Sequence, residues 1–117
     1  MDRRTIALVT DLIFATKIRS TAQAVGASVD FVRNAVDLPA AAAGPVARVI
    51  IDLNADGLDA PSAIAAARSL PGPPTVICYL SHVQTDLAAA ARDAGADEVL
   101  PRSLFAARLP EILSATP

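Results

Sequence analysis

Short apolar runs of strand length alternate along this chain with longer segments of helical spacing, five times in succession. When strands and helices alternate strictly, neighbouring strands run parallel and the helices form the crossovers between them. The alternation therefore predicts an α/β fold, a doubly wound parallel sheet of five strands with helices on both faces. The length of 117 residues suits a single domain over residues 1–117.

The expected strands are buried apolar runs, and the expected helices carry apolar residues three and four positions apart. We predict strands over residues 5–10, 28–32, 46–53, 75–80 and 98–100. We predict helices over residues 13–25, 39–43, 61–70, 81–95 and 104–113. Gly26 is placed to end the first helix. Pro110 predicts that the last helix is kinked, or begins later than its apolar residues suggest.

Composition limits the classes of function. The chain has 26 alanines and only 3% aromatic residues, which predicts a thin, aliphatic core. The formal net charge of −2 offers no positive field for phosphate backbones, so we expect no nucleic-acid partner. The lone Cys78 lies in an apolar run and predicts core packing. Asp11 cuts the first apolar run too short for a signal peptide, and no later stretch could span a membrane. We therefore expect a soluble, cytoplasmic protein.

Four polar residues follow the expected strands, where doubly wound sheets bind their ligands. They are Asp11, Asp52, Ser81 and Arg102. Asp11 and Asp52 should converge at one edge of the sheet, and two carboxylates with a backbone carbonyl would form a weak Mg²⁺ site. Asp11 has an alternative role as the cap of the first helix. Arg102 is expected to pair with Asp52 or with a phosphoryl group.

The element order and these residues resemble the CheY-like receiver domains of response regulators, over nearly the whole chain. The most specific segment is Ala94-Gly95-Ala96-Asp97-Glu98-Val99-Leu100, which is similar to the stretch leading into the fifth receiver strand. Ile50-Ile51-Asp52-Leu53-Asn54 resembles the strand end that carries the phosphoacceptor. The resemblance implies a flavodoxin-like (βα)5 fold, with Asp52 as the nucleophile and the backbone carbonyl of Asn54 as a metal ligand beside Asp11.

Several positions depart from the receiver pattern. Thr10 stands where receivers carry a second acid, which predicts weakened Mg²⁺ affinity. Arg102 aligns with the receiver lysine. Leu80 stands where receivers carry a threonine or serine whose hydroxyl responds to the phosphoryl group. Ser81 follows one place later and is a possible substitute. Val99 stands where receivers carry the aromatic residue that moves with that hydroxyl. These departures are typical of a divergent receiver or pseudo-receiver.

Other motifs are weaker. The segment from Asp52 to Gly57 matches the first half of an EF-hand loop, but Ala63 stands where the loop requires glutamate. His82 beside Ser81 favours a solvent-facing histidine over a catalytic pair, since no serine elbow surrounds it. Arg102 and Arg108 could form an anion site, although exposed arginines at helix starts are common. The sequence contains no dinucleotide fingerprint or P-loop, so we expect no cofactor besides weak Mg²⁺.

These observations leave three hypotheses. The first is a stand-alone receiver-like signalling protein of a two-component or phosphorelay system, not an enzyme. Asp52 would be its phosphoacceptor, and its partner a histidine kinase, a phosphotransfer protein or a downstream target. The second is a phosphate-independent pseudo-receiver scaffold, which could form a homodimer through the alanine-rich segment from Leu87 to Ala94. The third is a small flavodoxin-like enzyme, which the fold by itself does not exclude.

Overall fold

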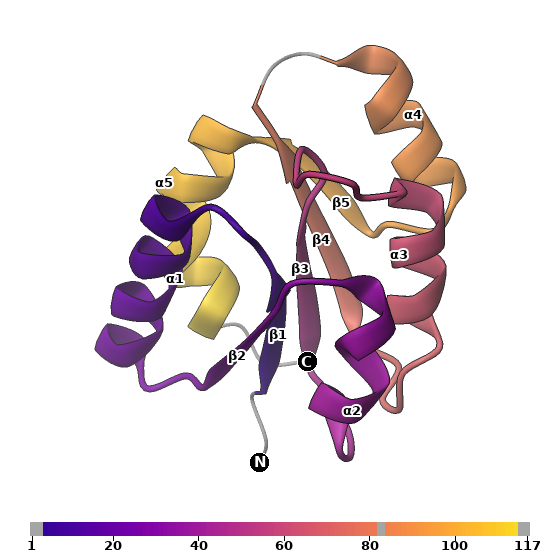
Figure 1. Ribbon diagram of the computed structural model, residues 1–117. Coiled ribbons are helices and arrows are strands. Elements are labelled where there is room, and N and C mark those ends of the chain that lie inside the picture. The colour runs from indigo at the N-terminus through magenta and orange to yellow at the C-terminus, as the bar shows by residue number, and fades with distance from the viewer. Residues whose placement is uncertain (1–3, 82–83, 115–117) are drawn as a thin grey trace.

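Five parallel strands form one sheet in the computed structural model, which describes residues 4–81 and 84–114 (Figure 1). Their order across the sheet is β2-β1-β3-β4-β5. The strands are β1 (Thr5–Leu8), β2 (Val29–Val32), β3 (Arg48–Asp52), β4 (Thr75–Leu80) and β5 (Glu98–Pro101). The predicted doubly wound five-stranded sheet is therefore confirmed.

Helices cover both faces of the sheet (Figure 1). The helices α1 (Leu12–Val25) and α5 (Arg102–Ser114) lie side by side on one face. The other face carries α2 (Leu38–Ala42), α3 (Ala60–Arg68) and α4 (Thr85–Asp93), with a short 3-10 helix, η1 (Ala35–Asp37), before α2. None of the helices in residues 4–81 and 84–114 is both long enough and apolar enough to cross a membrane.

Most boundaries agree with the expected ones to within a few residues, and two helix starts were predicted wrongly. The helix α4 begins at Thr85 rather than at Ser81, and Gln84 precedes it without a side-chain cap. His82, which was expected in its first turn, lies outside the described residues. The helix α5 begins at Arg102, earlier than Leu104, and continues through Pro110 to Ser114.

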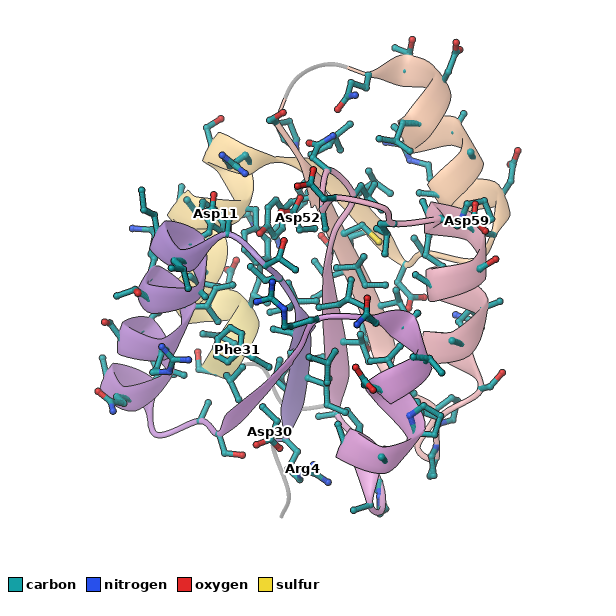
Figure 2. All side chains as sticks on the ribbon, viewed as in Figure 1. Arg4, Asp11, Asp30, Phe31, Asp52 and Asp59 are labelled. Carbon is teal, nitrogen blue, oxygen red and sulfur yellow. The ribbon has the colours of Figure 1, made fainter. Side chains whose placement is uncertain are left out.

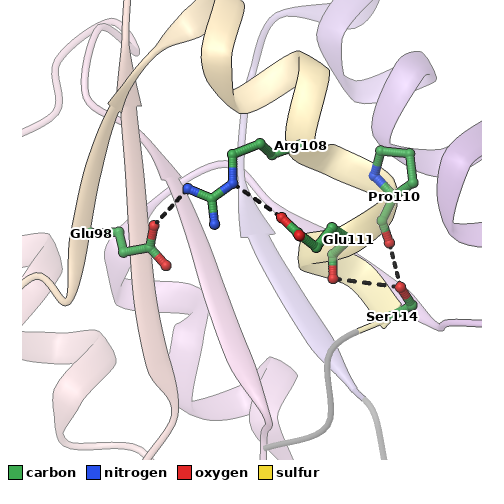
Figure 3. Close-up of polar contacts among 5 residues, drawn as sticks. All are labelled: Glu98, Arg108, Pro110, Glu111 and Ser114. Carbon is green, nitrogen blue, oxygen red and sulfur yellow. Dashed lines mark hydrogen bonds and ion pairs between the residues drawn. The ribbon is translucent and has the colours of Figure 1, made fainter.

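Side-chain contacts lie on both sides of Pro110 in α5, and one of them joins the helix to β5 (Figure 3). Arg108 lies between Glu98 of β5 and Glu111, at 3.4 and 3.2 Å. The Ser114 hydroxyl donates a hydrogen bond of 2.6 Å to the carbonyl of Pro110. Arg108 is paired with these two carboxylates, and the anion site with Arg102 that the sequence left open stays a prediction.

Glycine ends α1 as predicted. Gly26 adopts the left-handed conformation at φ 74°, and its N–H bonds back to the carbonyls of Ala22 and Gln23. L-residues with a side chain resist this conformation, so glycine is the favoured residue here.

The two faces of the sheet are packed differently. Between the sheet, α2, α3 and α4 the core is aliphatic, and several alanines are among its fully buried residues, including Ala63, Ala67 and Ala91. Between the sheet, α1 and α5 the core contains Phe14, Tyr79 and Phe105. The predicted aliphatic core is thus correct for one face only, because three of the four aromatic residues gather on the other.

Candidate functional site

Asp52 is the last residue of β3 and is only 3% exposed. Its Oδ1 accepts a hydrogen bond of 2.9 Å from the backbone N–H of Asn54, which turns the chain away from the strand. Burial raises the pKa of the Asp52 carboxyl above its ordinary value, and the charge of Asp11 adds to this. The Asn54 N–H and the Arg102 guanidinium oppose the increase. The site therefore holds a carboxyl short of compensating positive charge.

Asp11 lies between β1 and α1 and caps the helix. Its Oδ1 accepts hydrogen bonds from the N–H groups of Ile13 and Phe14, at 2.9 and 3.4 Å. Its Oδ2 lies 3.6 Å from Nη2 of Arg102 in an ion pair. The capping role that the sequence offered for Asp11 is thus present in the structure, and its role as a metal ligand stays a prediction. Figure 2 shows Asp11 and Asp52 at the same edge of the sheet.

Arg102 is the first residue of α5, and its guanidinium lies over the aromatic rings of Phe14 and Tyr79, at 5.0 and 5.9 Å from their centroids. We expected Arg102 to pair with Asp52 or a phosphoryl group. In the structure its ion pair is with Asp11, because the first turns of α1 and α5 are adjacent. It acts on Asp52 through its charge, which lowers the pKa of that carboxyl.

Asn54 and Ser81 join two loops at the strand ends. The Asn54 side-chain oxygen accepts a hydrogen bond of 2.6 Å from the backbone N–H of Ser81. Its amide nitrogen donates one of 2.9 Å to the side chain of Gln84. Ser81 is exposed, and its backbone rather than its hydroxyl makes this contact. The Asn54 side chain thus fixes the loop after Asp52 against the loop after β4.

Leu80 and Val99 pack against the opposite face of the sheet from Tyr79, in the aliphatic core. A cavity of about 240 Å³ opens between α4 and β5, and both residues line it. Neither side chain can form a hydrogen bond, so these two positions cannot detect a polar change at Asp52 directly.

Sequence analysis missed the aromatic cluster beside the site. The ring of Tyr79 lies 4.8 Å from that of Phe14 and 4.6 Å from that of Phe105. Burial, followed by the negative charge of Asp52, raises the pKa of the Tyr79 phenol well above its ordinary value. The signal available in the sequence was that Phe14, Tyr79 and Phe105 each lie within a few residues of an expected strand end, where Asp11, Asp52 and Arg102 were expected.

The charges of the site suit a divalent cation. Two carboxylates and one guanidinium leave a net charge of −1, and buried Asp52 carries a raised pKa. Mg²⁺ is commonly held by one or two carboxylates with water completing its shell. Asp11 and Asp52 fit that description, although the oxygens of Asp11 already have partners. Among the described residues no group of three or more acidic, histidine or cysteine side chains is placed to hold a metal ion, so a cation here would rest on few protein ligands.

The strand order and the helix layers define a flavodoxin-like α/β protein, and solved structures narrow this to the CheY-like receiver fold. A receiver domain of a sensor histidine kinase from Pseudomonas aeruginosa, described with magnesium in its active-site cleft, is 17% identical, with a TM-score of 0.79 over 97% of this chain and 95% of that one. A CheY-like receiver domain protein from Methanospirillum hungatei is 14% identical, with a TM-score of 0.81 over 97% and 91%.

A chemotaxis response regulator of Vibrio cholerae is 15% identical, with a TM-score of 0.80 over 97% of each chain. No protein-family profile and no curated protein sequence matches the chain. The chain therefore has the receiver fold over nearly its whole length, at 14–17% sequence identity to these three structures.

Proposed function

We propose that this protein is a receiver-like signalling module in which Asp52 accepts a phosphoryl group. The observation that carries the proposal is the position of Asp52 at the end of the central strand β3, beside Asp11 and within the field of Arg102. Receiver domains with the same fold are signalling proteins, and this function requires no turnover of a metabolite.

The chemistry follows from the ionised carboxylate. An oxygen of Asp52 attacks the phosphorus of a phosphohistidine or of acetyl phosphate, forming an acyl phosphate. The donor's P–N or P–O bond breaks, and its electron pair leaves with the imidazole or the acetate. Water later attacks the phosphorus and returns Asp52 with inorganic phosphate. The Asn54 N–H and the charge of Arg102 favour the ionised form that attacks.

Asp11, Asp52 and the backbone carbonyl of Asn54 are the groups that would hold Mg²⁺. A divalent cation bound there would offset the negative charge of a phosphoryl donor. Arg102, held by Asp11 and by the rings of Phe14 and Tyr79, supplies a positive charge beside these groups.

The partner we propose is a histidine kinase or phosphotransfer protein. Leu12 and Ile13 are 78% and 82% exposed in the first turn of α1, directly after Asp11, and Leu104 is 44% exposed in the first turn of α5. These apolar side chains lie within two residues of Asp11 and Arg102, at the edge of the sheet that a phosphohistidine must approach. Ile13→Asp should therefore impair transfer from a protein donor and leave labelling by acetyl phosphate intact.

The test is intact-mass spectrometry after incubation with acetyl phosphate and Mg²⁺. One phosphoryl mass is expected on the wild type and on Asp56→Asn, which alters an exposed aspartate in the next loop. The adduct should be lost in Asp52→Asn. An unmodified wild type, or an adduct that survives Asp52→Asn, contradicts the proposal.

A second candidate, a phosphate-independent scaffold, is favoured by Leu80 and Val99. They place apolar side chains in the lining of the cavity between α4 and β5, where receivers carry the switch residues. A second copy of the chain could pack on that surface. A monomeric mass in sedimentation at high protein concentration would argue against this dimer.

A further inference from the structure

Three of the chain's four aromatic residues form a cluster next to the candidate phosphoacceptor, and each comes from a different element. Phe14 belongs to α1, Tyr79 to β4 and Phe105 to α5. Tyr79 stands opposite Asp52 in the pairing of β3 with β4. The cluster therefore connects the residue beside Asp52 to both helices on that face of the sheet.

The cluster contains two buried polar atoms whose hydrogen bonding is incomplete. Among the described residues, the Tyr79 hydroxyl and Nε of Arg102 are the buried side-chain polar atoms without a hydrogen bond of ordinary geometry. The Tyr79 hydroxyl is near enough to Asp52 for a weak hydrogen bond, which lowers the pKa of that carboxyl and raises the pKa of the phenol. Tyr79 is 0% exposed, so water does not readily supply an acceptor. Buried donors are almost always satisfied, and leaving one unsatisfied costs free energy. A state of the protein that provides an acceptor at this point would therefore gain stability.

Asp52 is the group that could provide such an acceptor. Its carboxylate is close enough to raise the pKa of the Tyr79 phenol, but its Oδ1 is held by the N–H of Asn54. A phosphoryl group on Asp52 would bring three further oxygens and additional negative charge. Leu80 and Val99, on the other face of the sheet, have no group that could respond.

We propose that the Tyr79 hydroxyl detects the charge state of Asp52 and transmits it through Phe14, Phe105 and Arg102 to α1 and α5. This inference rests on the proposed function, since phosphorylation is the change in charge that would be detected. Tyr79 takes no part in the transfer of the phosphoryl group and responds only to the charge on Asp52. The responding surface is then the face formed by α1 and α5 rather than the α4–β5 face.

The first experiment needs no phosphorylation. Hydrogen exchange of peptides from α1 and α5 is measured in the wild type, Asp52→Asn, Tyr79→Phe and the double variant. Removing the charge of Asp52 should change exchange in the first turns of both helices by about fivefold to tenfold, the equivalent of about one hydrogen bond. The change should disappear in the Tyr79→Phe background, because only the hydroxyl is missing there. Equal effects in both backgrounds, or no effect in either, would overturn the inference.

Ser81→Ala is the matched control, because it removes a hydroxyl from the end of the same strand. The response to Asp52→Asn should be unchanged in that background. If Ser81→Ala abolishes the response, Ser81 detects the charge and our assignment to Tyr79 is wrong. Tyr79→Phe should fold normally, since it keeps the stacked ring and removes only a hydroxyl that makes no hydrogen bond of ordinary geometry.

The second experiment separates the inference from the proposed function. Tyr79 is the only tyrosine and the chain has no tryptophan, so ultraviolet emission reports on this residue alone. With acetyl phosphate and Mg²⁺, the emission should change in step with the phosphoryl mass. An adduct without a change in emission or exchange overturns the role of Tyr79 and leaves Asp52 as a phosphoacceptor. If no adduct forms, the proposed function fails, and the four-variant comparison still decides the role of Tyr79.

Discussion

Nη2 of Arg102 lies 3.6 Å from Oδ2 of Asp11, while Oδ1 of the same carboxylate caps α1. One carboxylate thus joins the first turns of two neighbouring helices. Both side chains are about one-third exposed, so the ion pair contributes little to stability by itself, about 0–1 kcal/mol. The cap is the larger contribution, because it satisfies backbone N–H groups that have no other partner.

The two roles of Asp11 can be separated by substitution. Asp11→Asn keeps a capping oxygen and should leave the free energy of unfolding within about 0.5 kcal/mol of the wild type. Asp11→Ala loses both the cap and the ion pair and should cost about 1 kcal/mol. Urea denaturation measures both. Equal losses in the two variants would show that the ion pair, rather than the cap, stabilises this end of the helix.

Asp52 should make stability depend on pH. Its folded carboxyl has a raised pKa, so the folded state binds the proton more tightly than the unfolded state. The wild type should therefore lose stability as pH rises from about 4 through the raised pKa. Asp52→Asn cannot titrate, and it should be more stable than the wild type at pH 7 with an advantage that shrinks toward pH 4. Thermal denaturation across this range measures the difference, and a constant difference would contradict the raised pKa.

Arg48 is a buried residue of β3 that connects the sheet to the end of α5. It is 3% exposed, and its Nη1 donates to the Thr5 hydroxyl at 2.9 Å and to the carbonyl of Leu113 at 3.2 Å. Arg48→Met should destabilise the protein by about 2 kcal/mol or more, since these acceptors lose a charged donor. Arg33→Met, at an exposed position, is the control and should change little. Urea denaturation again gives the comparison.

Cys78 should be unreactive in the folded protein. It is 0% exposed, and burial, with a smaller effect from the charge of Asp97, raises the pKa of its thiol to about 12. Only the thiolate reacts readily, so a disulfide reagent at pH 8 should label Cys78 at the rate at which the protein unfolds. Labelling should be immediate in denaturant. Rapid labelling of the native protein would mean that this strand opens locally.

The sequence predicted the sheet well because its signals were local. The run from Thr75 to Leu80 has no polar alternation and is a buried strand with the predicted bounds. The start of α4 was missed because the spacing from Ser81 to Gln84 resembles a capping box, whereas Asn54 bonds the N–H of Ser81 and the side chain of Gln84. That contact joins residues far apart in the chain, and no local pattern reports it.

For the site, the sequence predicted which residues come together but not how they pair. Asp11, Asp52 and Arg102 come together because each follows a parallel strand, and this follows from topology alone. Which carboxylate Arg102 pairs with depends on how closely α1 and α5 pack, and that distance is set by the aromatic rings between them. Side-chain geometry of this kind lies outside what hydrophobic periodicity can indicate.

The different packing of the two sheet faces has a consequence for how this protein can mutate. The buried alanines of α3 and α4, Ala63, Ala67 and Ala91, are 0% exposed and have almost no side chain left to remove. Added methylenes there would force the helices from the sheet, at about 1–3 kcal/mol for each overpacked site. On the face of α1 and α5 the opposite holds, because shrinking a stacked ring leaves a void. Selection should therefore remove substitutions that enlarge side chains on the face of α3 and α4. On the face of α1 and α5 it should remove substitutions that shrink them.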